Sequence, residues 1–192
     1  MAGRRQFDEE AVLGQAEGLF RARGYGATSM QDLARATGVQ RGSLYNAFGD
    51  KEEVFVRTFA RYRARFLAAA EDALSAPDAR TGLAAFLTVA VANMTAGPVR
   101  GCLSTRLATE GQGAGMRVSA EVRGLLDQLE LLLLAAFSRP GIRPALPAEA
   151  AARLVVIFTR GLAVMERVHG DPERLGADVD ALVSLLFPQP PG

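Results

Sequence analysis

Apolar residues recur every three or four positions along most of this chain, and polar residues fill the positions between them. That spacing gives a helix one buried face and one solvated face, whereas the strict alternation of a half-buried strand does not persist. The first such segment predicts a helix over about Glu9 to Arg23. Asp8 precedes it as an N-cap, and Gly24 follows it as a residue that tolerates a positive φ. The pattern predicts an all-α protein that begins with a capped helix.

Two short helices are predicted next. One begins after Thr28, with Gln31 completing a capping box, and ends before Gly38. The other covers about Arg41 to Phe48. Two helices joined by three or four residues that include a glycine form a helix-turn-helix, whose second helix enters the DNA major groove.

The fourth predicted helix is long, with Asp50 as its N-cap and Pro77 beyond its end. A stripe of aromatic residues at helical spacing runs along it, namely Phe55, Phe59, Tyr62 and Phe66. Glycine and proline breakers divide the remainder into five further helices, giving about nine in all. These five lie at roughly 78–96, 100–111, 115–138, 147–168 and 173–187.

Composition narrows the class of protein. Of all residues 49% are apolar and the formal net charge is +1, so a folded core is expected and disorder is not. Residues 1–67 carry 11 Lys and Arg against 8 Asp and Glu, so the segment with the helix-turn-helix is the basic one. The longest apolar run, Leu131–Phe137, is too short to cross a bilayer, and the N-terminal residues lack a secretory signal pattern. Cys102 is the only cysteine, so a reducing cytoplasm without membrane contact is expected.

The helix-turn-helix separates inward from outward positions. Leu33, Ala34, Val39 and Leu44 are spaced to pack the two helices together. The outward set is Arg41, Gly42, Ser43, Tyr45 and Asn46. Arginine can bind guanine O6 and N7 and asparagine can bind adenine N6 and N7, while serine and tyrosine commonly hold phosphates. Each residue taken singly is an ordinary solvated one, but the combination with the turn indicates DNA contact.

Residues 7–66 resemble the DNA-binding domain of the TetR/AcrR family, through "LFRARGYGATSMQDLARATGV" and "RGSLYNAFGDKEEVF". The resemblance implies that Thr28 and Gln31 approach the DNA backbone or a base edge. It implies that the outward residues of 41–46 form the recognition helix and that Lys51 binds a phosphate. Two positions depart from the family pattern: Gln40 stands where many members have Ser, and Ala47 where many have His, so no contact is carried over to Ala47.

A weaker resemblance covers the C-terminal part. "RGCLSTRLATE" is similar to the start of the sixth helix in a subset of the family, whose members enclose a ligand among the helices of about 78–138 and dimerise through the last two helices. The expected architecture is therefore a three-helix DNA-binding domain, residues 1–50, joined by the long fourth helix to a helical ligand-binding and dimerisation domain, residues 51–192. The expected function is a repressor that binds a palindromic operator in double-stranded DNA as a homodimer and is released by a small apolar or amphipathic inducer. No cofactor, metal or catalytic activity is expected.

Two sets of candidate residues follow from this expectation. Apolar walls with a few polar groups are the usual design of a ligand pocket. The pocket candidates are Phe86, Met94, Cys102, Leu103, Met116, Phe137 and Phe158, with Arg106 as a polar anchor. The dimer candidates are Leu154, Phe158, Gly161, Leu162, Met165, Val179, Leu182, Val183 and Leu186, which repeat at helical spacing in the last two predicted helices.

Other interpretations remain open. Cys102 could sense oxidants or electrophiles if its thiol pKa were lowered, although a free cysteine is more often a small buried apolar residue. Gly161 could accommodate a neighbour within the chain instead of a second subunit. An all-helical enzyme is a more remote possibility, because the chain carries none of the common catalytic motifs while catalytic groups can be dispersed in sequence.

Overall fold

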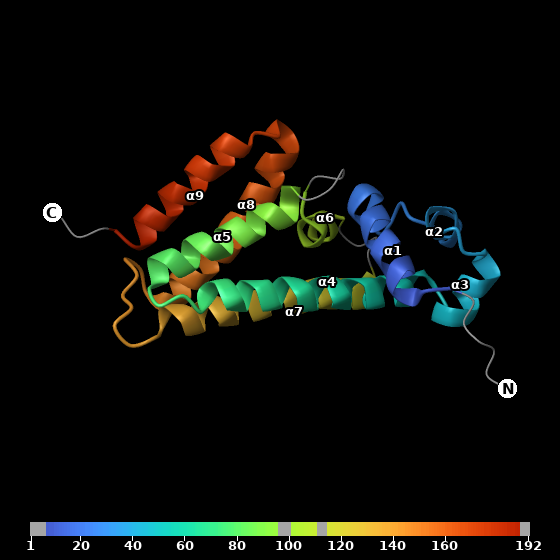
Figure 1. Cartoon of the computed structure of the whole chain (residues 1–192), viewed down its shortest axis with the longest axis horizontal. Coiled ribbons are helices and arrows are strands. Elements are labelled where there is room, and N and C mark those ends of the chain that lie inside the picture. Colours follow the sequence, from blue (N-terminus) through green and yellow to red (C-terminus); the bar gives the residue numbers. More distant parts are fainter. Residues whose placement is uncertain (1–6, 96–100, 111–114, 189–192) are drawn as a thin grey trace.

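The computed structural model describes residues 7–95, 101–110 and 115–188, and within them every regular element is a helix (Figure 1). The helices are α1 (Glu9–Arg23), α2 (Met30–Thr37), α3 (Arg41–Phe48), α4 (Lys51–Leu74), α5 (Ala79–Thr95), α6 (Leu103–Thr109), α7 (Gly115–Phe137), α8 (Ala148–His169) and α9 (Pro172–Leu186). The predicted all-α class is confirmed, and the predicted boundaries lie within a few residues of those observed. No helix of the described residues is both long enough and apolar enough to cross a membrane.

Side-chain caps explain where the N-terminal helices begin. The Asp8 carboxylate accepts a hydrogen bond from the Glu10 amide at the start of α1, and Asp50 accepts one from the Glu53 amide at the start of α4. Each bond satisfies an amide that has no partner within its helix. Both caps were predicted from the sequence.

The cap of α2 corrects the sequence prediction by one residue. Ser29 is the N-cap: its Oγ accepts from the Asp32 amide at 3.1 Å, and the Asp32 carboxylate accepts from the Ser29 amide at 3.0 Å. The capping box is thus Ser29 with Asp32, and not Thr28 with Gln31. Thr28 is only 2% exposed, and its hydroxyl donates to the Gly24 carbonyl at 2.6 Å. Thr28 and Ser29 are both residue types that cap helices. Thr28 is buried, and the exposed Ser29 is the cap.

A continuous aromatic column ties the N-terminal helices to α4. Phe20 of α1 packs edge-on against Phe55 of α4 with their ring centroids 5.2 Å apart. Phe55 stacks on Phe59 at 5.5 Å, and Phe59 packs on Tyr62 at the same centroid distance. All four side chains are fully buried. Since α4 also packs against α5 and α7, one helix contributes to the core of both regions.

The remaining helices surround the rest of α4. In Figure 1, α4 and α7 run side by side along the length of the molecule, and α5 lies over α4 on the other side. α8 packs on α5 and α7, and α9 packs on α5 and α8. The short α6 lies between these helices and α1 and packs against α1. α5 also reaches α1, because the Asn93 carbonyl accepts a hydrogen bond from the Arg21 guanidinium at 2.7 Å.

Candidate nucleic-acid interface

α2 and α3 form the predicted helix-turn-helix at one end of the molecule (Figure 1). Gly38 adopts a left-handed conformation with φ of 67°, which reverses the chain between the helices without the strain a side chain would add. Leu33 and Leu44 are buried between the helices, and Ala34 and Val39 pack against the same core. The four inward residues named from the sequence therefore hold the motif together.

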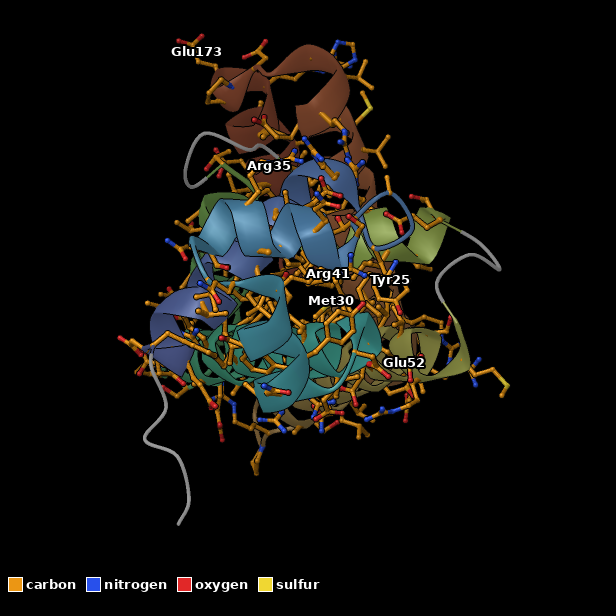
Figure 2. All side chains as sticks on the ribbon, turned by 90° about the vertical axis from the view of Figure 1, so that its right-hand side faces the viewer. Tyr25, Met30, Arg35, Arg41, Glu52 and Glu173 are labelled. Atoms are coloured by element: carbon orange, nitrogen blue, oxygen red, sulfur yellow. The ribbon has the colours of Figure 1, made fainter. Side chains whose placement is uncertain are left out.

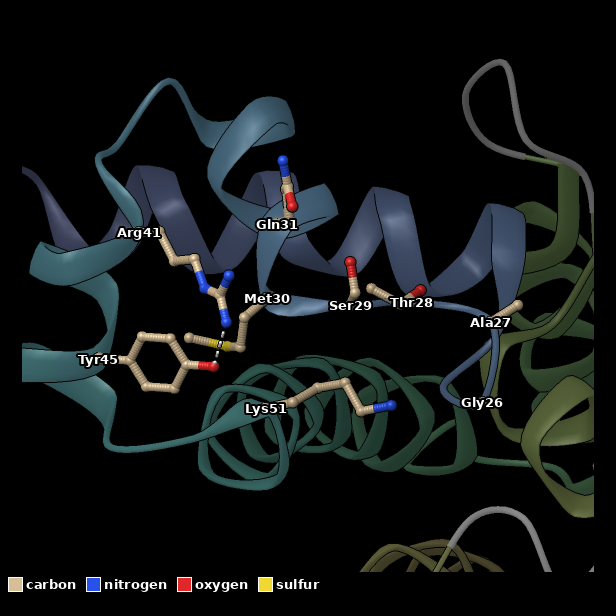
Figure 3. A pocket seen from close by; sticks show the side chains of 9 residues that line it. All are labelled: Gly26, Ala27, Thr28, Ser29, Met30, Gln31, Arg41, Tyr45 and Lys51. Carbon is tan, nitrogen blue, oxygen red and sulfur yellow. Dashed lines mark hydrogen bonds between the residues drawn. The ribbon is translucent and has the colours of Figure 1, made fainter.

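A groove of about 500 Å³ opens beside α3. It is lined by a stretch of chain from the α1–α2 turn into α2, by two residues of α3 and by the first residue of α4, as Figure 3 shows. The lining residues are Gly26, Ala27, Thr28, Ser29, Met30, Gln31, Arg41, Tyr45 and Lys51. Figure 2 looks onto this end, with Met30 and Arg41 near its centre. Two cationic groups line this groove together with backbone and hydroxyl groups, which suits a phosphate-bearing partner.

Arg41 and Tyr45 form a pair on α3. They are one helical turn apart, so their side chains meet on one face. The Arg41 guanidinium donates to the Tyr45 hydroxyl at 3.2 Å, and its carbon lies 5.3 Å from the centre of the Tyr45 ring. Both residues are exposed, so the pair presents a planar cation and a hydroxyl to the groove.

Lys51 reaches from the first turn of α4 toward the α1–α2 turn (Figure 3). Its ammonium donates to the Tyr25 carbonyl at 3.0 Å and lies 4.1 Å from the centre of the Tyr25 ring. Burial, together with the negative charges of Glu52 and Asp50, raises the pKa of the Tyr25 hydroxyl above its ordinary value, so this ring stays neutral. The ammonium is held at the edge of the groove by a carbonyl and a ring face.

The predicted DNA-contact residues fall into two groups. Gln31, Arg41, Tyr45 and Lys51 line the groove together. Gly42 and Asn46 are exposed on α3 outside this lining, and Ser43 is half-buried. Thr28 lies along the groove, but its hydroxyl is committed to Gly24 as described above. Ser29 is exposed in the groove and was not named, although its N-cap role could have been read from Asp32 three residues later.

The pocket candidates of the C-terminal region do not gather at one place. Phe86, Met94, Cys102 and Leu103 are buried, and Phe158 is half-buried. Phe137 packs against Phe187 near the end of α9, with ring centroids 5.4 Å apart. Arg106 forms an ion pair with Glu110 at 3.6 Å. Met116 is 91% exposed in the first turn of α7, apart from the buried candidates, and it lines a surface pocket of about 640 Å³.

Cys102 lies within a buried polar cluster. Its Sγ is 3.0 Å from Ser104 Oγ, 3.5 Å from the Tyr62 hydroxyl and 3.7 Å from an Arg160 guanidinium nitrogen. Asn93 donates to the Tyr62 hydroxyl at 2.9 Å. Burial by itself would raise the pKa of the thiol, but the positive charge of Arg160 and the hydrogen bonds from its neighbours outweigh burial and lower that pKa to about 6. The guanidinium and the hydrogen bonds therefore favour the thiolate more than burial disfavours it.

The dimer candidates also divide. Leu162, Val179, Leu182, Val183 and Leu186 are buried inside the chain itself, so the α9 stripe named from the sequence faces inward. Leu154, Phe158 and Met165 are half-buried, and Gly161 is exposed. The apolar residues that face outward were not named from the sequence; they are Ile157, Val164 and Val168 of α8 and Leu185 of α9. Ile157, Gly161, Val164 and Val168 lie at helical spacing on one side of α8, and we call these four residues the outer apolar face.

The alternative role of Gly161, accommodation of a neighbour within the chain, does not fit the structure. A Cβ built on Gly161 would meet nothing within 4 Å among the described residues. The absence of a side chain at Gly161 therefore does not allow any closer contact within the chain, and it affects only the surface of α8.

Comparisons with known proteins agree with this geometry. Residues 12–58 match the family described as bacterial regulatory proteins, tetR family. The chain is 45% identical over 62 residues to the HTH-type transcriptional repressor ComR of Escherichia coli (strain K12), a match that covers 32% of this chain and 30% of that protein. It is 36% identical over 77 residues to the uncharacterized HTH-type transcriptional regulator YezE of Bacillus subtilis (strain 168), covering 40% of each. The matches thus span well under half the length of either curated relative.

Solved structures extend the likeness to the whole chain. A cysteine mutant of the TetR family transcriptional regulator CifR, complexed with 26-bp double-strand operator DNA, superposes with a TM-score of 0.86 at 29% identity. That comparison covers 94% of this chain and 97% of the other. The long helix, the C-terminal helices and the N-terminal motif are therefore arranged as in a protein that has been seen on its operator.

Proposed function

The chain belongs to the TetR family of bacterial regulatory proteins, and we propose that it is a repressor that binds a palindromic operator as a homodimer. It is a DNA-binding transcriptional regulator by its family and its helix-turn-helix. The observation that carries the proposal is the groove in which Gln31, Arg41, Tyr45 and Lys51 converge. Arg41 supplies the bidentate donor that recognises guanine, and Lys51 supplies a charge for a phosphate. The similarity to a protein named a repressor favours repression over activation.

A homodimer is proposed because a palindromic site needs two reading heads related by two-fold symmetry, one helical turn of DNA apart. The outer apolar face is the surface that suits the contact. Ile157 and Val168 are each more than half exposed, which an unpartnered helix would avoid. Gly161 lies between them in sequence, where the absence of a side chain lets a partner helix approach closely.

The test of DNA binding uses sequences selected from a random DNA pool by the wild-type protein. Arg41→Ala should weaken binding by about 1–3 kcal/mol and relax the preference at one base position of each half-site. Lys51→Ala should weaken binding to all sequences alike and reduce the dependence of affinity on salt. Arg153→Ala, which removes an exposed arginine of α8, is the matched control and should change little. Unchanged footprints with Arg41→Ala would reject this placement of the recognition helix.

The test of the dimer is Gly161→Arg read by light scattering and circular dichroism together. The new side chain has open space in the single subunit, so the variant should stay helical while its mass falls to that of a monomer. Gly18→Arg, at another exposed glycine with nothing within 4 Å, should remain dimeric. A Gly161→Arg variant that stays dimeric and still binds operator would remove Gly161 from the interface.

Release from the operator by a small apolar or amphipathic inducer is part of the same proposal. Such a compound would bind among α5 to α8, near the buried Phe86, Met94 and Leu103. It would act only by binding more tightly to the subunit arrangement whose heads do not match the operator spacing. A compound that raises the melting temperature yet leaves operator affinity unchanged would argue against induction by that route.

A second candidate function, favoured by the lowered thiol pKa, is a repressor that responds to oxidants through Cys102. A thiolate attacks the O–O bond of hydrogen peroxide to give the sulfenate and water. The burial of Cys102 weighs against rapid reaction, because the peroxide must first reach the sulfur. If Cys102 is the sensor, mild peroxide should release the wild-type protein from DNA and leave Cys102→Ser bound. Equal responses of the two proteins would reject this candidate.

A further inference from the structure

Glu110, a residue distant in sequence, binds the backbone of the α1–α2 turn. Glu110, which follows the last residue of α6, accepts hydrogen bonds from the Tyr25 amide at 2.9 Å and from the Gly26 amide at 3.0 Å through Oε2. Its Oε1 is 3.2 Å from the Tyr25 amide. One carboxylate thus holds two successive backbone amides of the turn, and hydrogen bonds to a charged acceptor are the stronger kind.

The local structure makes room for this carboxylate. Gly24 has a φ of 85°, and a Cβ at this position would overlap the carboxylate of Glu110. Arg106, one turn earlier on α6, forms an ion pair with Glu110 at 3.6 Å. The Glu110 side chain is 19% exposed, so the contact is largely shielded from water. The carboxylate is therefore oriented from its own helix and fits closely beneath the turn.

The same turn carries the DNA groove on its other side. Gly26, whose amide Glu110 holds, is the first residue of the groove lining. The Tyr25 carbonyl accepts from the ammonium of Lys51, whose charge also lies over the Tyr25 ring. The backbone of Tyr25 consequently links Glu110, which belongs to the C-terminal region, to Lys51, which belongs to the groove.

We propose that Glu110 is a positioning residue for DNA binding: its carboxylate fixes the Tyr25–Gly26 turn from α6 and thereby sets the position of Lys51 and of one wall of the groove. This inference rests on the proposed operator binding. Glu110 acts through the turn and does not touch DNA. A displacement of α6 would be transmitted to the groove by this contact, because Glu110 directly follows α6 and holds the Tyr25 and Gly26 amides.

The first experiment compares operator affinities of full-length Glu110→Ala and the wild-type protein, on DNA selected by the wild-type protein. Removing a negative charge from a DNA-binding protein by itself strengthens binding, because the repulsion of phosphates falls. Loss of the turn contact should instead weaken binding by about tenfold. Glu110→Gln, which keeps one acceptor oxygen but no charge, should lie between the two. Glu130→Ala, which removes the partner of Arg153 on α7, is the charge-matched control and should bind as tightly as wild type or more tightly.

A double-mutant cycle with Lys51→Ala tests the route of the effect. If Glu110 acts through Lys51, the combined loss should be smaller than the product of the two single losses. Losses that multiply, or an affinity of Glu110→Ala equal to that of Glu130→Ala, would overturn the proposal. Circular dichroism confirms that each variant is folded, and Glu110→Gln carries the test if Glu110→Ala does not fold.

A measurement without DNA separates this inference from the proposed function. Amide hydrogen exchange at Tyr25 and Gly26 should be about tenfold faster or more in Glu110→Ala than in wild type, since both amides lose their acceptor. Unchanged exchange at these amides would refute the contact itself, whether or not the protein binds DNA. Failure of the wild-type protein to select any DNA would refute the operator binding on which the positioning role rests, while the exchange result would still report on the turn.

Discussion

The thiol of Cys102 should make the free energy of unfolding depend on pH, and Cys102→Ser should remove this dependence. The pKa of the buried thiol is lowered from its ordinary value of 9.0 to about 6, chiefly because the charge of Arg160 outweighs the cost of burial. A group whose pKa is lowered by folding adds stability above its unfolded pKa and loses that contribution as the pH falls through its folded pKa. The window is therefore pH 9 down to about pH 6.

The size of the effect follows from the shift. One unit of pKa corresponds to somewhat more than 1 kcal/mol, so the full change from 9.0 to about 6 corresponds to about 4 kcal/mol. At pH 7 only part of this stabilisation is present, so the free energy of unfolding should be about 1 kcal/mol higher than at pH 5. Cys102→Ser cannot ionise in this range. The free energy of unfolding of the wild type minus that of Cys102→Ser should be flat below pH 6 and rise steadily from pH 6 to pH 9.

The assay is urea unfolding of both proteins at pH 5, 7 and 8.5, at one protomer concentration and under reducing conditions. Arg160→Gln supplies the complementary variant: without the guanidinium, burial dominates and the thiol stays protonated, so the rise should disappear. A difference between wild type and Cys102→Ser that does not change with pH would refute the thiolate. It would also remove the main support for an oxidant-responsive repressor.

Two further outcomes concern packing and capping. Phe59→Ala should lower the free energy of unfolding by about 3–5 kcal/mol in denaturant melts, because it removes a fully buried ring between Phe55 and Tyr62; a loss below about 1 kcal/mol would contradict the continuous column. Ser29→Ala should cost about 1 kcal/mol by removing the acceptor for the Asp32 amide. Ser29→Thr, which keeps a hydroxyl acceptor at the exposed N-cap position, is its control, and an equal cost for the two variants would contradict the assigned cap.

The sequence predicted the features that depend on local rules. The bounds of α1 and the caps at Asp8 and Asp50 follow from residue types whose preferences act within one turn of helix. The inward and outward residues of the helix-turn-helix follow from periodicity, as does the aromatic column of α4. The cap of α2 was missed because Thr28 with Gln31 and Ser29 with Asp32 both have the spacing of a capping box. In the structure the Thr28 hydroxyl donates to the Gly24 carbonyl, and Ser29 caps the helix.

Features that depend on distant residues could not be predicted in the same way. Glu110 contacts Tyr25 across 85 positions of sequence, and nothing near either residue signals the other. On α9, helical spacing identified an apolar stripe but could not say whether it meets its own chain or a second one. The stripe of Val179, Leu182, Val183 and Leu186 is the inward one. The exposed apolar residues of α8 and α9 lie off the main apolar stripe, so periodicity alone does not identify them as an interface.

The shared core of α4 bears on how a reading head of this kind could be exchanged between proteins. Phe55 lies after the start of α4, yet its ring fills the space between Phe20 and Tyr25. A chimera joined at residue 50 would give the transplanted head a foreign residue at the centre of its core. A junction just beyond Phe59 would transfer the Phe55 ring together with the N-terminal helices. Tyr62 would then come from the recipient protein, which is appropriate because the Tyr62 side chain belongs to the polar cluster around Cys102. The useful seam for recombination therefore lies inside a continuous helix and not in a loop.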